Sequence, residues 1–97
     1  MNKATVLKLM AAHDQQIRSR FGVKTLALFG SAARDEMRDT SDIDLLVQFA
    51  GPATLDSYMD LKFYLEEVLG RPVDLVTEKG LRQEIRPAVE REAIRVA

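Results

Sequence analysis

Three acidic residues interrupt apolar segments of the sequence, namely Asp42, Asp44 and Asp74. Asp42 and Asp44 are two positions apart, so an extended strand would place both carboxylates on one face and the intervening apolar residues on the other. Carboxylates gathered in one place repel one another unless a cation lies between them. Mg²⁺ takes oxygen ligands and typically combines one or two carboxylates with phosphate oxygens of a substrate. The three acids are therefore candidate Mg²⁺ ligands and candidate catalytic residues.

A Gly30-Ser31 pair follows the apolar run 25–29 and could supply the other half of such a site. Gly30 has no Cβ atom, so its backbone can approach a ligand closely. Ser31, near the start of a helical turn, offers a hydroxyl and backbone N–H groups to phosphate oxygens. Metal-binding carboxylates beside a phosphate site favour phosphoryl or nucleotidyl transfer, in which two ions would bracket the attacking and leaving oxygens.

Two arginines near this region are candidates for phosphate binding. Arg34 could reach a bound triphosphate, or it could form a salt bridge to Asp35, Asp39 or Asp42. Arg71 precedes the segment that contains Asp74 and could contact phosphate from there.

Hydrophobic periodicity and turn signals predict the elements that must position these residues. The expected order is a helix over 3–20 ended by Gly22, a strand over 25–29, a helical turn over 31–34, a loop over 35–41, a strand over 42–49, a helix over 54–69, a strand over 73–76, a charged helical stretch over 78–94, and a short strand or frayed end over 95–97. Pro87 should divide the charged stretch into two short helices. Its alternating acids and bases are typical of a solvated helix face or of a docking surface for a charged partner.

The connections between the strands predict the fold class. Helix 54–69 is long enough to carry the chain through a right-handed crossover, so strands 42–49 and 73–76 should be parallel. The connection between the first two strands is too short for such a crossover, so these strands should be antiparallel. We expect an α+β fold, a small mixed β-sheet with helices packed on one face. In this arrangement the Gly30-Ser31 pair and all three carboxylates meet at one end of the sheet.

Size and composition limit the class of protein. The 97 residues are 46% hydrophobic and 30% charged, which predicts a single globular domain over 1–97. The net charge is −1 and no basic stripe carries interleaved aromatic residues, so we expect no direct nucleic-acid binding. The chain has no Cys, which excludes a thiolate metal site and a Cys nucleophile. The first residues lack the apolar core of a signal peptide, and no apolar run reaches the ~18 residues of a membrane span, so a cytoplasmic protein without membrane contact is expected.

The motifs resemble the signature of the DNA polymerase β-like nucleotidyltransferase superfamily. That signature is Gly-Ser, ten residues, and then Asp-x-Asp; here Gly30-Ser31 is followed by the ten residues 32–41 and by Asp42-Ile43-Asp44. The segment Val73-Asp74-Leu75-Val76 is similar to the third carboxylate strand of that superfamily. The short chain resembles the minimal, MNT-type nucleotidyltransferases. It departs from them at Asp35, where many relatives have Gly, and this adds an acid near the phosphate site.

The resemblance implies a role for each matched residue. Gly30 and Ser31 would hold the β- and γ-phosphates of ATP, with Arg34 as a further phosphate ligand. The Asp-x-Asp pair would ligate Mg²⁺, and Asp74 would ligate the catalytic ion and help to deprotonate the attacking hydroxyl. In the relatives the acceptor implied is a tyrosine of a HEPN ribonuclease toxin, which AMPylation silences. The resemblance therefore implies a prokaryotic antitoxin that is a protein adenylyltransferase.

Two other functions remain open from the sequence. The chain could be a non-catalytic antitoxin that neutralises its toxin by binding, although the intact acids and Gly-Ser pair favour activity. It could also be a small-molecule nucleotidyltransferase, acting for example on an aminoglycoside, but such relatives usually carry an additional helical domain.

Overall fold

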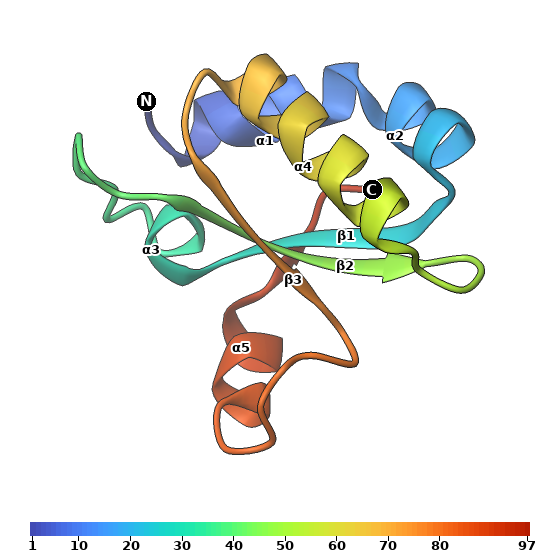
Figure 1. Ribbon diagram of the computed structural model, residues 1–97. Coiled ribbons are helices and arrows are strands. Elements are labelled where there is room, and N and C mark those ends of the chain that lie inside the picture. The colour runs from blue at the N-terminus through green and yellow to red at the C-terminus, as the bar shows by residue number, and fades with distance from the viewer.

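A four-stranded mixed sheet with strand order β3-β2-β1-β4 forms the centre of the computed structural model, which describes residues 1–97 (Figure 1). The elements in chain order are α1 (Lys3–Ala12), α2 (Asp14–Phe21), β1 (Val23–Phe29), α3 (Gly30–Ala33), β2 (Ile43–Phe49), α4 (Leu55–Leu69), β3 (Val73–Thr77), α5 (Arg86–Glu92) and β4 (Ile94–Arg95). This confirms the α+β class and the small mixed sheet expected from the sequence.

The pairing of the strands follows the predicted topology. β1 and β2 are antiparallel, whereas β2 and β3 are parallel and are joined through α4. Thr54 caps α4 because its hydroxyl oxygen accepts the Ser57 N–H at 3.0 Å, and Gly70 ends the helix at φ 66°. The crossover therefore returns the chain to the same end of the sheet at which β2 began.

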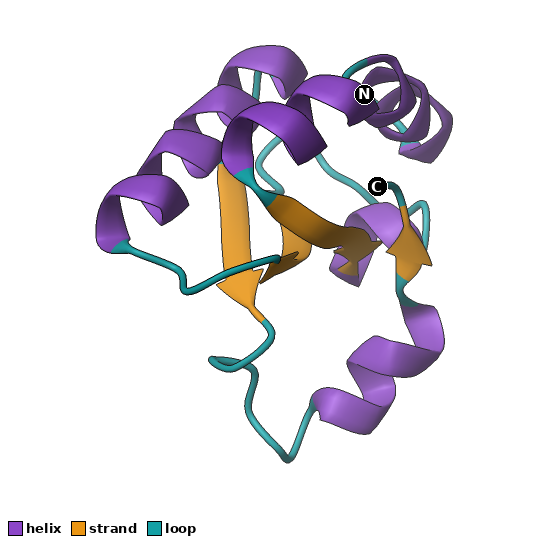
Figure 2. Ribbon diagram, turned by 90° about the vertical axis from the view of Figure 1, so that its right-hand side faces the viewer, coloured by secondary structure: helices purple, strands orange, loops and turns teal.

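The core lies between the sheet and a layer formed by α1, α2 and α4, which cover one face (Figures 1 and 2). Ile43, Leu45 and Val47 alternate along β2 and are almost completely buried against this layer. From the helices, Leu61 and Leu65 of α4 are fully buried. The period-2 pattern of the strand thus turns its remaining side chains to the opposite face.

The predicted single helix over 3–20 is wrong, because the structure divides it at His13 into α1 and α2. His13 has φ −110° and ψ 12°, and its ring Nδ1 lies 2.9 Å from the Leu9 carbonyl oxygen. The break changes the direction of the chain so that Met10 before it and Ile17 after it are both fully buried. Periodicity alone does not register such a change of direction.

The C-terminal region also differs from the prediction of two short helices. Residues 78–85 form turns, and Pro87 lies in the first turn of α5 instead of between two helices. Proline is compatible with that place because the first N–H groups of a helix have no intrahelical partner. The terminal residues form β4, which pairs with β1.

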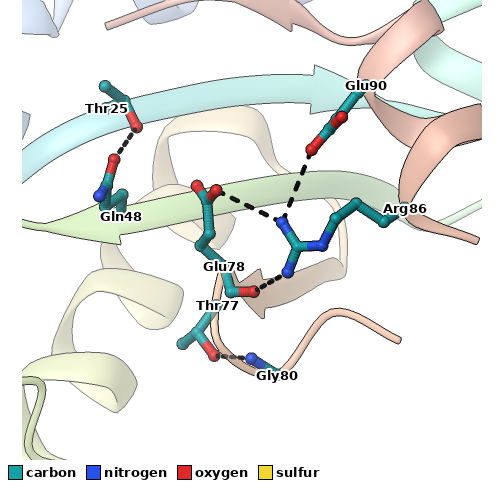
Figure 3. Close-up of polar contacts among 7 residues, drawn as sticks. All are labelled: Thr25, Gln48, Thr77, Glu78, Gly80, Arg86 and Glu90. Atoms are coloured by element: carbon teal, nitrogen blue, oxygen red, sulfur yellow. Dashed lines mark hydrogen bonds and ion pairs between the residues drawn. The ribbon is translucent and has the colours of Figure 1, made fainter. Parts of the chain in front are cut away.

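α5 lies on the side of the sheet away from the main helix layer (Figure 1). Its first residue, Arg86, donates to the Glu78 carbonyl oxygen at 2.8 Å and forms ion pairs with the Glu78 and Glu90 carboxylates at 3.4 and 3.6 Å (Figure 3). These contacts fix the beginning of α5 to the segment after β3. None of the helices has both the length and the apolar character needed to cross a membrane.

Candidate active site

Asp44 and Asp74 lie side by side at the start of the two parallel strands. The register of β2 with β3 pairs these residues directly, and Asp42 immediately precedes β2. Both chain neighbours of Asp44 are fully buried in the core, so Asp44 is on the face of the sheet away from α1, α2 and α4. The structure thus brings the three acids to one end of the sheet.

Asp42, Asp44 and Asp74 form an acid cluster in which Asp44 is partly buried beside the two other carboxylates. Burial, followed by the negative charges of Asp74 and Asp42, raises the pKa of Asp44 to about 6, against an opposing effect of Arg34. Two carboxylates that repel one another in this way are stabilised by a cation placed between them. The electrostatics therefore fit a cation site.

The donor set fits Mg²⁺ in particular. All three side chains offer oxygen, although no group of three or more His, Cys, Asp or Glu side chains in residues 1–97 is arranged to hold a metal ion. Mg²⁺ is usually bound by one or two carboxylates and completes its shell with waters and substrate phosphates. An open acid cluster suits an ion that arrives with a nucleotide.

The turn between β1 and α3 requires glycine at position 30. Gly30 has a φ of 70°, in the left-handed region that side chains disfavour. A Cβ atom there would overlap Oδ2 of Asp44 and would lie 2.9 Å from its Cγ atom. Ser31 follows in the first turn of α3 and is half-buried. Any side chain at position 30 would therefore displace the Asp44 carboxylate.

Arg34 pairs with two acids, neither of which was among the partners that the sequence suggested. Its Nε atom donates to Glu36 at 2.6 Å and its Nη1 atom donates to Glu92 at 2.8 Å. The predicted alternatives Asp35, Asp39 and Asp42 are not its partners. The sequence did not favour Glu92 because the contact spans 58 residues.

Arg71 holds the loop between α3 and β2. Its Nη2 atom donates to the backbone carbonyl oxygens of Arg38, Asp39 and Ser41 at 2.6, 3.0 and 2.9 Å. These bonds give Arg71 a structural role at the entrance to β2.

Asp35, the departure from the family pattern, is turned away from the phosphate site. Its Oδ1 atom accepts the Lys3 backbone N–H at 3.0 Å. Its φ of 57° is a left-handed conformation, which Gly adopts without strain and Asp tolerates better than most residues. A glycine would therefore fit the backbone at this position.

Glu92, at the end of α5, is the residue of this region that sequence reasoning missed. Besides Arg34 it accepts the Gly30 backbone N–H at 2.9 Å. Glu92 lies in a run of alternating charges, which is typical of a solvated helix face or of a docking surface for a charged partner. The useful signal was the apolar segment that follows it, since pairing of that segment with β1 brings Glu92 close to Gly30.

The acid cluster lies on an open face. One hollow of the surface, about 750 Å³, is located between α2 and α4 and is lined by residues such as Phe21, Phe63 and Tyr64. A second hollow, about 410 Å³, adjoins the far ends of β2 and β3. Neither hollow contains a residue of the acid cluster or of the Gly30-Ser31 turn.

Comparison with known proteins identifies a family, relatives and solved structures that are similar to this chain. The sequence matches the nucleotidyltransferase domain family over residues 11–96. The protein adenylyltransferase MntA of Thermococcus cleftensis is 40% identical over 88 residues, covering 91% of this chain and 89% of the relative. A solved minimal nucleotidyltransferase superposes with a TM-score of 0.82 at 41% identity, covering 97% of this chain and 95% of the other.

A more distant structure shares the fold. It is a chain from the complex of tri-AMPylated Shewanella oneidensis HEPN toxin with MNT antitoxin, at 19% identity and a TM-score of 0.67, covering 94% of this chain and 71% of the other. The resemblance noted from the Gly-Ser and Asp-x-Asp motifs is thus confirmed over almost the whole chain. The chain belongs to the nucleotidyltransferase domain family, as an enzyme of the minimal, MNT type.

Proposed function

We propose that this nucleotidyltransferase uses Mg²⁺ and ATP to transfer AMP to a hydroxyl, most simply that of a tyrosine, on a HEPN ribonuclease toxin, and so acts as an antitoxin. The observation that carries the proposal is the pairing of Asp44 with Asp74 directly beside the Gly30 turn. The name of the Thermococcus relative and the HEPN–MNT complex support the acceptor and the partner. Residues 1–97 act as one domain, in the prokaryotic cytoplasm where ATP and such a ribonuclease are found.

The transfer joins the acceptor oxygen to the α-phosphorus of ATP. As this bond forms, the bond from the α-phosphorus to the bridging oxygen of the β-phosphate breaks, and pyrophosphate leaves. Asp74, exposed at the start of β3, accepts the hydroxyl proton. Gly30, which has no Cβ atom, lets the β- and γ-phosphates approach the backbone closely, Ser31 binds them through its N–H and its hydroxyl, and Arg34 adds a positive charge.

The acid cluster would hold two Mg²⁺ ions. When bound, they neutralise phosphate charge and make the attacking hydroxyl more acidic. The protein contributes the fixed spacing of Asp42, Asp44 and Asp74, which the parallel register of β2 and β3 maintains. Neutralising one of these acids should therefore weaken both ion binding and transfer.

The exposed position of the acid cluster is consistent with a macromolecular acceptor. A tyrosine on another protein can approach an open face, whereas a small molecule is usually held in a pocket that buries most of its surface. Asp42 and Asp74 are both exposed, which supports an acceptor that is presented by another protein.

The test combines the purified chain, Mg²⁺, α-labelled ATP and the candidate HEPN partner. We expect label and a mass gain of AMP on the partner. Asp44→Asn should reduce the rate at least about 100-fold because it removes a metal-binding charge. Asp60→Asn, an exposed residue of α4, is the matched control and should leave the rate unchanged.

Two results would contradict this function. Toxin that is neutralised without label, equally by the wild type and by Asp44→Asn, would identify a binding antitoxin without catalysis. Label on an aminoglycoside and none on the partner would identify a small-molecule nucleotidyltransferase.

A further inference from the structure

Glu92 joins two parts of the phosphate-binding region with one carboxylate. Its Oε1 atom accepts the Gly30 backbone N–H at 2.9 Å, and its Oε2 atom accepts from Nη1 of Arg34 at 2.8 Å. Gly30 is 62 residues away in the sequence and Arg34 is 58 residues away. The Glu92 side chain is 25% exposed, half the exposure of Arg34, so the contact is partly shielded from water.

The contact leaves part of the guanidinium available to a ligand. Glu36 takes the Nε donor and Glu92 takes a donor of Nη1, while Nη2 of Arg34 has no hydrogen bond within the protein. Arg34 is also near enough to Asp44 to oppose the rise of the Asp44 pKa. Two acids thus hold Arg34 at the edge of the acid cluster with unused donors, which is a suitable arrangement for binding phosphate.

Glu92 is in its charged form in this arrangement. Burial alone would raise the pKa of Glu92, but the Gly30 N–H and the Arg34 guanidinium together lower it below its usual range. A charged carboxylate with both oxygens engaged is a firm anchor, because charge-assisted hydrogen bonds are shorter and stronger than neutral ones.

The backbone holds Glu92 from both sides. It is the last residue of α5, and the beginning of that helix is fixed through Arg86 to Glu78 (Figure 3). β4 begins two residues after Glu92, and its Ile94 pairs with Leu28 of β1. A residue fixed at both ends is better suited to hold a turn in place than to move in and out of a site.

We propose that Glu92 is a positioning residue, which holds the Gly30 turn and Arg34 in the arrangement that receives the phosphates of the nucleotide. The proposal rests on the function proposed above, since it concerns the nucleotide of that same site. It assigns α5 and β4 a part in nucleotide binding, although they carry none of the family motifs. The opposite role, a carboxylate that occupies the place of a phosphate and competes with it, predicts the reverse effect of mutation.

The test compares Glu92→Gln with Glu90→Gln by calorimetric titration of Mg²⁺–ATP into the full chain without acceptor. Gln retains an oxygen for the Gly30 N–H but loses the charge that holds Arg34. We expect Kd for Mg²⁺–ATP to rise about three- to tenfold in Glu92→Gln. Glu90→Gln removes an ion pair of the same helix away from the site and should leave Kd unchanged.

A second comparison distinguishes positioning from a general loss of structure. In an Arg34→Ala background, Glu92→Gln should weaken binding by less than about twofold, because the residue through which it acts is absent. Both variants should also remain folded at the temperature of the titration, as thermal unfolding checks, since Gln keeps the oxygen that accepts the Gly30 N–H in Glu92→Gln and Glu90→Gln loses only an exposed ion pair.

Three outcomes would overturn the proposal. Binding in Glu92→Gln as tight as in the wild type, or tighter, would show that Glu92 is dispensable or competes with phosphate. A full additional loss in the Arg34→Ala background would show a separate role. A wild type that does not bind Mg²⁺–ATP would overturn this proposal and the function together, whereas binding without AMP transfer would contradict only the function.

Discussion

At the scale of single residues, Gly30 connects backbone geometry to the position of the Asp44 carboxylate. Gly30→Ala should lose transfer activity because the new Cβ atom displaces the Asp44 side chain. The left-handed φ should also cost roughly 1–3 kcal/mol of stability. Thermal unfolding and AMP-transfer rates check the two effects separately.

Gly22→Ala is the control for this prediction. Gly22 has nearly the same φ, 65°, but a Cβ atom there meets nothing within 4 Å. It should show a similar backbone penalty with its transfer rate retained. Equal activity of the two variants would contradict the proposed link between position 30 and Asp44.

At the scale of elements, α4 is the crossover that makes β3 parallel to β2 and so places Asp74 beside Asp44. α4 packs on the sheet through the buried side chains along one side of the helix. Tyr58 adds a polar contact, since its hydroxyl donates to the Leu75 carbonyl oxygen of β3. The geometry of the acid cluster therefore depends on packing that lies on the other face of the sheet.

Two substitutions on α4 test this dependence. Leu65→Ala removes a fully buried side chain and should lower the free energy of unfolding by about 2–5 kcal/mol. Phe63→Ala, two residues away but with Phe63 57% exposed, should change it by less than about 1 kcal/mol. Chemical denaturation measures both, and similar losses would mean that α4 is not packed in this orientation.

At the scale of the whole molecule, ionisation of Asp44 in the acid cluster lowers the free energy of unfolding. The pKa of Asp44 is about 6 in the folded protein, above its ordinary value of 3.8, so folding favours the protonated form. Stability from this group is therefore present below about pH 4 and is lost as the pH rises through about 6. In the absence of metal, the ionised Asp44 carboxylate therefore destabilises the folded protein at neutral pH.

Asp44→Asn should consequently stabilise the metal-free protein at pH 7.5 while it abolishes transfer. The expected gain is on the order of 1 kcal/mol after allowance for solvent screening, and it should shrink towards pH 4. Thermal unfolding in EDTA at several pH values measures the difference between variant and wild type. Addition of Mg²⁺ should stabilise the wild type more than the variant, and a variant less stable than the wild type at pH 7.5 would contradict the prediction.

The strands and their pairing could be predicted because their signals are local. Alternating apolar residues indicate β1, β2 and β3, and the lengths of the connections decide which pairs are parallel. The break at His13 and the place of Pro87 could not be predicted in this way, because both depend on which surface the adjoining helices pack against. For the same reason the alternating charges of the C-terminal run indicated a solvated face or a docking surface, and not the contact that its last acid makes with Gly30.

The sequence by itself determined the chemistry of the candidate site. The types and expected placement of Gly30-Ser31, Asp42, Asp44 and Asp74 favoured phosphoryl or nucleotidyl transfer, since side-chain alternation and strand direction follow from local pattern. The resemblance of these motifs to the polymerase β-like superfamily then implied a nucleotidyltransferase. Only the tertiary structure decided which charges surround these groups. Arg34 takes Glu36 and Glu92 as partners, and Asp44 acquires its raised pKa, because burial and contacts across about sixty residues depend on how the elements pack together.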